Sequence, residues 1–549
     1  MLHSCSRCMR RGWGVALGLG LFLGLCQTSI AHAADIIVNS TADNTIAGDG
    51  FCTLREAVNN ANANADTTAG DCRAGNLLPS DQILLSAGVY TLTPGLDDSN
   101  AHGDLDIRTS GGNMELIGAG ALSTTISGPG YVVGTDRILH TGVDGPGAVI
   151  VEVHDLTLRD GHAPQGGGAI YINGTFVLVE ASVIAGCVAV FAGGMSNNGN
   201  GGAIYMSGGD LTILNSHLIS NTARASVIAD VQGGAIHATN GANVLIEDSV
   251  LQENQASILD TGVARTSAGA IFFDGTSLTI RRSQIISNSV AASYRDDAGF
   301  GGALYFAGTA LLLEDSTVAG NTAGEVGGAL YHTGMSAEIV RSTFSGNRAP
   351  QGYGGAIVNT RAMTLTNTTV SGNVALWTAG GVSNGFSGAL ALYNVTVTDN
   401  TCATGGDFMG GGCGVHHWGT SVLVQNSILA GNHDLGTGRS LSPDAGGSFT
   451  SLGHNLVGVA ASGFVDGVNG DLAGTNSAPL AAELQPLDNY GGPTQSHLPT
   501  WSSPAIDAGD AARYPPTDQR RVSRPLGAGC DIGAIEVGIP YFLPALQKE

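Results

Sequence analysis

Positive charge and aromatic side chains are scarce in this sequence. Charged residues make up 12% and aromatic residues 5% of the 549 positions, and lysine occurs once, at Lys548. The formal net charge is −23. Such a surface repels nucleic-acid phosphates and anionic lipids, so nucleic acid is excluded as an expected partner. Apolar residues make up 43% of the chain, which is too many for a disordered protein.

Long apolar runs are missing except near the N-terminus. Gly12 to Cys26 form a short apolar core after Arg7, Arg10 and Arg11, and Ala31–Ala33 (AHA) is a small-residue cleavage site. This order is typical of a secretory signal. We therefore expect residues 1–33 to be a Sec-type signal and the protein to be exported, to the outer surface, the medium or the periplasm. No later stretch is expected to span a bilayer.

Cysteine is infrequent, and three of the nine cysteines lie in the predicted signal. An exported protein meets an oxidising compartment, which allows disulfides. The pairs that are close in sequence are Cys52 with Cys72 and Cys402 with Cys413, and we predict both bridges. Cys187 and Cys530 are expected to stay unpaired, because a linear rod would hold them roughly 40 Å apart, far beyond the reach of a disulfide.

Glycine, in contrast, is abundant and recurs in a fixed pattern. Gly327–Tyr331 (GGALY) returns as Gly354–Val358 (GGAIV), and short runs of Val, Ile, Leu and Thr lie between such marks without a helix-length pattern. This period predicts a solenoid. About three short strands in each repeat predict an all-β, single-stranded parallel β-helix, right-handed by the crossover rule, with the Gly-Gly pairs at one corner.

Asparagine marks a second recurring corner, five residues after a Ser or Thr column. A catalytic group is needed once, whereas a structural ladder is needed in every coil, so we predict hydrogen-bonded ladders here. We also expect the asparagines to adopt left-handed backbone. The column consists of Asn221, Asn254, Asn288, Asn321, Asn347, Asn373, Asn400 and Asn432.

Residues 34–110 are expected to cap the first coil. Cys52–Val58 is interpreted as a short helix with a Thr53–Glu56 capping box, ended early by the asparagines that follow it. The motif CTLREA, followed by Gly103–Ile107 (GDLDI), resembles the N-terminal module named for Cys-Ser-Leu-Arg-Glu-Ala. That module begins exported bacterial β-helix proteins, so the resemblance implies an exported β-helix with a helical N-terminal cap.

Residues 111–433 carry the repeats. Within them, roughly residues 150–433 resemble the GGAI and FxxN repeats of chlamydial polymorphic outer-membrane proteins, and Phe344–Asn347 (FSGN) matches the second motif in full. Residues 434–537 contain SLGHNL, GGPTQ, SPAIDAG, DQR and CDIGAIE in that order. This series resembles the choice-of-anchor Q domain, which ends exported β-helix proteins ahead of sorting signals. We expect a β-rich C-terminal domain there, followed by a short tail at 538–549 with no recognisable sorting motif.

Groups that suit catalysis or metal binding are few. Polysaccharide lyases and hydrolases on this fold need clustered carboxylates, often with a basic residue. The sequence offers Asp97-Asp98 with Asp104 and Asp106, and Arg295-Asp296-Asp297. His416-His417-Trp418 lie near Cys413, but the spacing from Cys402 favours a loop disulfide over a metal site. No nucleotide or dinucleotide fingerprint is present, so neither a metal nor a cofactor is expected.

One turn segment varies in length from coil to coil. Between Asn321 and the next Gly-Gly corner it is only Thr322–Val326 (TAGEV), but it is about twice as long in four consecutive earlier coils: Val188–Asn200, Thr222–Gln232, Gln255–Ser267 and Ser289–Phe300. Insertions at one register emerge from the same edge of a solenoid, so they are expected to stack into a ledge.

The ledge supplies the candidate binding residues: Phe191, Arg224, Asp230, Asp260, Arg265, Tyr294, Arg295, Asp296 and Asp297. Aromatic, Arg and carboxylate groups side by side suit recognition of a glycan or a cell-surface protein. The sequence thus favours an exported, non-catalytic binding protein that is adhesin-like or associated with the cell surface. A polysaccharide lyase or glycoside hydrolase, and a structural envelope or matrix component, are the alternatives.

Overall fold

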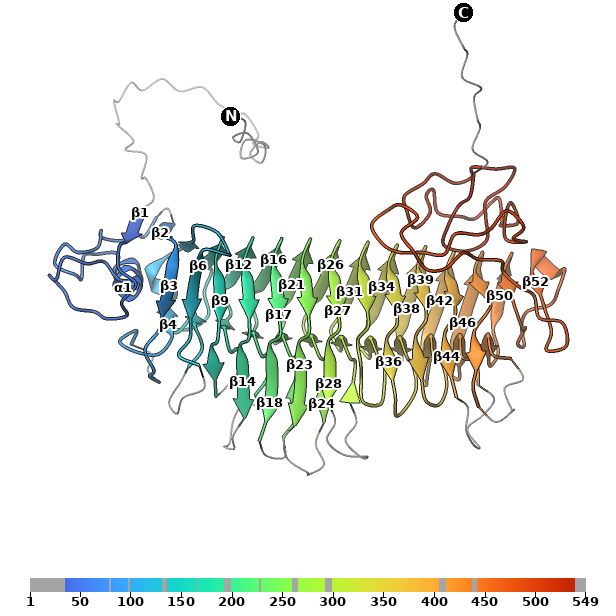
Figure 1. Ribbon diagram of the computed structural model, residues 1–549, viewed down its shortest axis with the longest axis horizontal. Coiled ribbons are helices and arrows are strands. Elements are labelled where there is room, and N and C mark those ends of the chain that lie inside the picture. Colours follow the sequence, from blue (N-terminus) through green and yellow to red (C-terminus); the bar gives the residue numbers. More distant parts are fainter. Residues whose placement is uncertain are drawn as a thin grey trace, which may run out of the picture. The chain divides into compact units, whose positions relative to one another are not determined.

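The computed structural model describes residues 35–538 apart from 79, 97–98, 131–135, 165, 192–198, 227–228, 259–264, 292–298, 404–410 and 437–441. Most of this region is a stack of coils, and each typical coil adds one parallel strand to each of three long sheets (Figure 1). The predicted parallel β-helix is therefore confirmed. No helix in the described part of the chain is long and apolar enough to cross a membrane.

The three sheets form the three faces of the solenoid. Sheet 1 has 14 strands from β1 (Asp35–Val38) to β50 (Thr450–Gly453), and sheet 2 has 14 strands from β3 (Gly88–Thr91) to β52 (Leu472–Ala473). Sheet 3 has 12 strands from β4 (Leu105–Ile107) to β49 (Ala445–Gly446).

A single coil illustrates the register of the three faces. The coil is formed by β8 (Ile150–His154) in sheet 1, β9 (Thr157–Arg159) in sheet 2 and β11 (Ile170–Asn173) in sheet 3. Alternate side chains of each strand point into one continuous apolar core, as period-two patterning requires.

The asparagine column forms a ladder inside the solenoid. Asn321 Oδ1 accepts hydrogen bonds from Asn288 N (2.9 Å) and Asn288 Nδ2 (3.0 Å), while Asn321 Nδ2 donates to Ile285 O (2.9 Å) and to Asn347 Oδ1 (3.0 Å). The same pattern runs from Asn221 to Asn432, where Asp444 Oδ1 takes over as the acceptor.

The expectation of left-handed backbone at these asparagines is wrong. The positive φ belongs to the residue before each Asn, for example Ser220 (54°) and Gly320 (65°). The preceding residue makes the turn, and this aims the Asn side chain into the stack, where each amide reaches the next coil.

Replacing Asn321 by alanine is expected to lower the free energy of unfolding by about 1–3 kcal/mol, because the buried Asn288 N–H then has no acceptor and the Ile285 carbonyl loses the Asn321 amide. Chemical denaturation measures the loss. Asn243→Ala is the matched control, because the Asn243 amide bonds to Asp210 on the outer face of sheet 1 (2.8 Å) and should change stability by less than about 0.5 kcal/mol. Equal midpoints for the two variants would contradict a stabilising ladder.

The helix of the N-terminal cap is longer than predicted. Helix α1 spans Leu54–Ala63 and begins with the predicted capping box between Thr53 and Glu56, but it continues through the asparagines and ends at Asn64 (φ 50°). Asn60 is tolerated in the helix because its side chain binds the following loop, donating to Cys72 O (3.2 Å) and accepting from Thr67 N (2.8 Å). Asn60 thus anchors the loop, and it is Asn64, the last asparagine of the run, that ends the helix.

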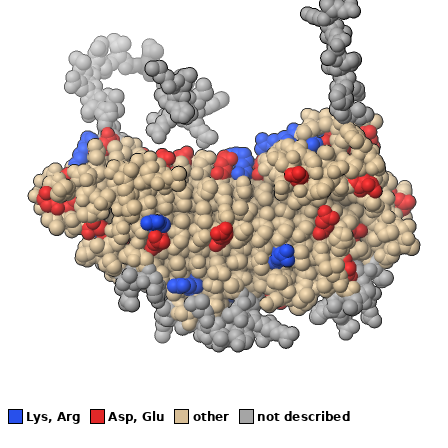
Figure 2. All heavy atoms as spheres, viewed as in Figure 1, with Lys and Arg blue, Asp and Glu red and all other residues tan. Residues whose placement is uncertain are grey.

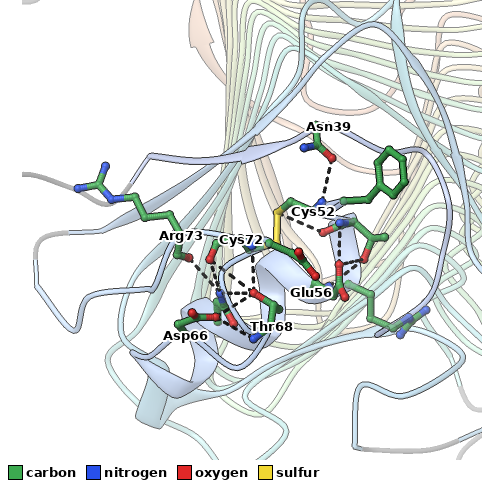
Figure 3. Close-up of a disulfide and its surroundings, with 12 residues drawn as sticks. Asn39, Cys52, Glu56, Asp66, Thr68, Cys72 and Arg73 are labelled. Atoms are coloured by element: carbon green, nitrogen blue, oxygen red, sulfur yellow. Dashed lines mark hydrogen bonds between the residues drawn. A yellow bond between two sulfur atoms is a disulfide. The ribbon is translucent and has the colours of Figure 1, made fainter. Parts of the chain in front are cut away.

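Both predicted disulfides are present. Cys52 and Cys72 join the start of α1 to the loop that follows it (Figure 3), and Cys402 joins Cys413. Cys187 and Cys530 are free and buried, and burial raises the pKa of their thiols to about 12 and about 11. The reason given for Cys530 is wrong, however, because the chain around it does not extend the rod. Gly533 N donates to Asn426 O (2.7 Å), which places this part of the chain beside an earlier coil.

The region after residue 433 divides into two parts. The first continues the coils through β50, β51 (Leu456–Val457) and β52, past the end predicted for the repeats. The second, residues 480–538, is called here the C-terminal segment; its described part has isolated bridges but no strand. It turns back and lies along the yellow and orange coils in Figure 1.

Hydroxyl groups on the outer face of sheet 2 hold the C-terminal segment. Thr369 Oγ1 donates to Gln519 Oε1 (2.7 Å), Gln519 Nε2 donates to Thr343 Oγ1 (2.9 Å), and Ala534 N donates to Thr396 Oγ1 (3.0 Å). Gln519 lies in the DQR motif and Ala534 in the CDIGAIE motif. In this chain, these motif residues therefore attach the segment to the side of the solenoid.

Candidate functional site

The ledge predicted from loop length is a folded structure. The outgoing parts of the four long turn segments form β14 (Val188–Phe191), β18 (Thr222–Ala225), β23 (Gln255–Ile258) and β28 (Ser289–Ala291), which pair in register in one sheet that also includes β10 (His162–Ala163). The returning parts form a second sheet of β19 (Val231–Gln232), β24 (Thr266–Ser267) and β29 (Gly299–Phe300). The described residues of these segments are called the ledge.

The ledge also has a small hydrophobic core of its own. Ala223, Ala225, Val231, Ala256 and Ile258 are buried together, separate from the core of the coils. The segments therefore do more than emerge from the same edge of the solenoid, because their side chains pack against one another. A built surface of this kind holds its outer groups in fixed positions.

The described candidate residues play different parts in the ledge. Phe191 is half-buried and packs against the ledge core, so it supports the ledge. Arg224 is half-buried and lies near His162. The pKa of His162 is lowered by the burial of its own ring and, to a smaller extent, by the positive charge of Arg224. Asp230 and Arg265 are exposed neighbours, since Asp230 Oδ1 accepts from Arg265 N (3.1 Å). Asp260, Tyr294, Arg295, Asp296 and Asp297 lie outside the described residues.

A row of neighbouring rings on the outer face of sheet 3, stacked from Tyr171 to Tyr305, was not predicted. The centroids of neighbouring rings lie 4.9–5.1 Å apart in the order His140, Tyr171, Tyr205, His237, Phe272, Tyr305 and Tyr331. Burial lowers the pKa of His237 to about 3 and raises that of Tyr331 to about 12, so these two rings are uncharged at neutral pH. The signal was present in the sequence, because most of these rings end a Gly-Gly-Ala-aliphatic landmark.

The predicted carboxylates Asp104 and Asp106 meet a histidine in the first coils. One ligand atom from each of Asp104, Asp106 and His140 lies within 4.8 Å of the others, a geometry that would admit a cation. Arg137 Nη1, however, lies 3.5 Å from Asp104 Oδ2, and Arg55 Nη1 donates to Asp104 O (2.9 Å). These guanidinium groups supply positive charge to the cluster. Asp97 and Asp98 lie outside the described residues.

A second carboxylate group, missed in the sequence, lies on the outer face of sheet 1. His154 Nε2 is 2.8 Å from Glu152 Oε2, and His154 Nδ1 is 3.4 Å from Glu180 Oε2. The hydrogen bond to Glu152, with help from Glu180 and Glu115, raises the pKa of His154. Strand register brings these residues together from three coils, which is why sequence spacing does not reveal them.

The structure also contains a cleft of about 640 Å³ between the C-terminal segment and sheet 2. Its lining includes Asp399, His433 and Glu483 among apolar residues, and His497 lies at one side. His497 Nε2 is 2.8 Å from Ser371 Oγ, and His497 Nδ1 is 2.8 Å from Gln485 O. Ser371 and His497 are each 2% exposed, so this pair joins the segment to the coils and is closed to a substrate.

Comparison with known proteins places the chain by its repeats. A family model described as "Right handed beta helix region" matches residues 141–370 and 269–451, together more than half of the chain. The chain belongs to the right-handed β-helix family. A crystal structure of pectate lyase Pel9A aligns with 93% of this chain and 98% of that chain, at 13% identity and a TM-score of 0.30, which carries no argument about substrate. No curated protein matches the chain.

In this β-helix the histidines beside Cys413 serve packing. Cys413 is bonded to Cys402, so neither thiol is available as a metal ligand. His416 is buried and lies edge-on to Trp418, with centroids 4.6 Å apart. His417 Nδ1 lies 3.1 Å from Asn384 Nδ2 inside the coil, and burial lowers the pKa of His417.

Proposed function

We propose that this chain is an exported, non-catalytic β-helix protein whose ledge binds a glycan or a cell-surface protein, in an adhesin-like or surface-associated role. The observation that supports this proposal most is the ordered construction of the ledge, with two registered sheets and a separate core. Irregular loop insertions would have neither the paired strands nor a core of their own. Asp230 and Arg265 stand exposed side by side on the ledge and give a partner groups of both signs.

Charge also supports a surface role. Charged side chains are sparse and scattered on the face seen in Figure 2, and the net charge of −23 keeps an exported protein soluble while disfavouring anionic partners. The basic, apolar and AHA sequence order at residues 1–33 supports export. A structural envelope role would need the coils but would not need a built ledge.

Removal of the ledge is expected to abolish binding and to leave the solenoid folded. Each of residues 188–200, 222–232, 255–267 and 289–300 is replaced by TAGEV, the segment that Thr322–Val326 supplies in the next coil. That shorter turn already fits the stack, since Thr322 bridges Ser289 and Arg348, and Val326 bridges Phe300 and Tyr353. Binding to a glycan array and to cells is measured beside the denaturant midpoint.

A second variant keeps the ledge and removes two of its exposed charges, as Asp230→Asn with Arg265→Gln. We expect this variant to bind less tightly and the trimmed protein not to bind. Full binding by the trimmed protein would rule out the ledge as the ligand surface.

A polysaccharide lyase or hydrolase is the second candidate, favoured by the cleft that holds Asp399 and Glu483. Paired carboxylates are the groups that glycoside hydrolysis needs. The discriminating assay measures reducing ends and unsaturated uronates released from polysaccharides. Release by the wild-type protein that disappears in Glu483→Gln would replace the binding function with the enzymatic one.

A further inference from the structure

The outer ring row on sheet 3 stops after Tyr331. In the same register the following coils carry Val358 and Ser383, and a ring returns only at His416. Aromatic side chains from the turns gather at this gap. Tyr353 precedes a Gly-Gly corner, Trp377 follows β40 (Val374–Ala375), and Trp418 follows β45 (Val415–His417).

The three turn side chains form one cluster that solvent reaches. The ring centroids of Tyr353 and Trp418 are 5.6 Å apart at 69°, and those of Tyr353 and Trp377 are 6.4 Å apart at 23°. Each tryptophan is 39% exposed. The chain has only four tryptophans, so two of them beside the same tyrosine are a concentration of a scarce residue.

The backbone under the cluster is held firmly. Trp377 N donates to Gly352 O (2.8 Å), and Trp418 N donates to Asn384 O (3.0 Å). A Cβ at Gly385 would lie 2.5 Å from Trp418 Nε1, so the indole is seated against bare backbone. The Cys402–Cys413 disulfide links β44 (Thr401–Cys402) to the segment that enters β45, which restrains the approach to Trp418.

We propose that Tyr353, Trp377 and Trp418 form a platform that binds a neutral polysaccharide, independently of the ledge. Aromatic faces set at an angle to one another suit the C–H faces of consecutive sugar rings, and the Tyr353 phenol is a polar group beside them that can hydrogen-bond to a sugar hydroxyl. The Ser383 hydroxyl is buried in the gap with no hydrogen-bond partner among the described residues, so it is a further polar group at this place.

Two observations favour a neutral glycan over other occupants. The first is charge. The three platform residues include no Arg or Lys, and Glu325 adjoins Tyr353, whose N–H donates to Glu325 O (3.1 Å). Together with the net charge of −23, this disfavours a polyuronate. A stable protein interface needs about 800 Å² from each partner, far more than two half-exposed indoles and one tyrosine provide.

The test uses the full mature chain and defined probes. Cellohexaose, xylohexaose and chitohexaose are the neutral probes and hexagalacturonate is the acidic one, with titration followed by calorimetry and tryptophan fluorescence. We expect at least one neutral probe to bind, with Trp377→Ala and Trp418→Ala each weakening it about tenfold or more, as loss of an aromatic anchor does. Trp418→Phe should retain part of the affinity.

Trp501→Ala is the matched control, since Trp501 is 64% exposed away from this register, and it should bind as the wild type does. Near-ultraviolet circular dichroism and the melting temperature establish that each variant is folded. The ledge-trimmed protein should keep the platform affinity, which separates this proposal from that for the ledge. The proposal is overturned if no neutral probe binds, if binding survives both alanine variants, or if hexagalacturonate binds as tightly through the same tryptophans.

Discussion

Arg55→Met is expected to lower the stability of the N-terminal cap by about 3–5 kcal/mol, the usual cost of breaking a buried ion pair from one side. The Arg55 side chain is fully buried, with Nε 2.7 Å from Asp43 Oδ1 and Nη2 3.0 Å from Asp43 Oδ2. It also donates to Gly103 O (2.8 Å) and Asp104 O (2.9 Å). The variant leaves the Asp43 carboxylate, which is 5% exposed, without its cation.

The effect should be local to the cap, because Arg55 joins α1 to the first coils and to no later one. Hydrogen exchange is expected to rise in α1 and in the GDLDI stretch while the central coils keep their protection. Arg73→Met is the matched control, since Arg73 belongs to the same cap but is exposed (Figure 3). Exchange in α1 that matches that of the control would show that Arg55 does not hold the cap.

Features that repeat in every coil could be predicted from the sequence. The Gly-Gly corners and the Asn column recur at fixed distances, so they report the fold even though no single coil would do so. The bonds from Asn288 to Asn321 and from Asn321 to Asn347 are copies of one interaction. The nearest cysteine pairs were predictable for a similar reason, because each closes a short segment of one region.

Features that depend on one long-range contact could not be predicted in this way. Gln519 bonds to Thr369 across 150 residues, and nothing in the local sequence around Gln519 indicates where its partner lies. A signal did exist on the other side of the contact. One outward register of sheet 2 changes from mixed residues to a run of threonines where the C-terminal segment binds: Val183, His217, Val250 and Gln284 are followed by Thr317, Thr343, Thr369 and Thr396.

The candidate site likewise has a part that could be predicted from repeated features and a part that could not. Equal insertion register in consecutive coils predicted that the ledge would stack, and its sheets follow that register. The inward packing of Phe191 was missed, because an aromatic residue in a loop segment has the same one-dimensional pattern whether it faces a partner or a small core. The aromatic platform was missed because its rings come from separate turns, and only strand register brings them to one gap.

Glu536→Ala is expected to lower the stability of the C-terminal segment itself by about 3–5 kcal/mol, and thereby to loosen its attachment to sheet 2. Arg524 and Glu536 form an ion pair of 2.9 Å in which both side chains are fully buried. Glu536 also accepts from Asp531 N (3.0 Å) and Leu526 N (2.9 Å). Its removal takes the ion-pair partner from the buried Arg524 guanidinium and the acceptor from the N–H groups of Asp531 and Leu526. Limited proteolysis followed by mass spectrometry should find new cleavage sites within residues 480–538.

Detachment of the segment should also uncover the hydroxyl positions that it now buries. Hydrogen exchange is therefore expected to rise at β35 (Thr343–Ser345), β39 (Thr369–Ser371) and β43 (Thr396–Thr398), while β17 (His217–Ile219) in an uncovered coil stays unchanged. Glu483→Ala is the matched control, because Glu483 lies on the same segment without a buried ion pair among the described residues. A Glu536→Ala protein that resists protease as the control does would mean that the hydroxyl contacts alone hold the segment, and that the buried pair contributes little.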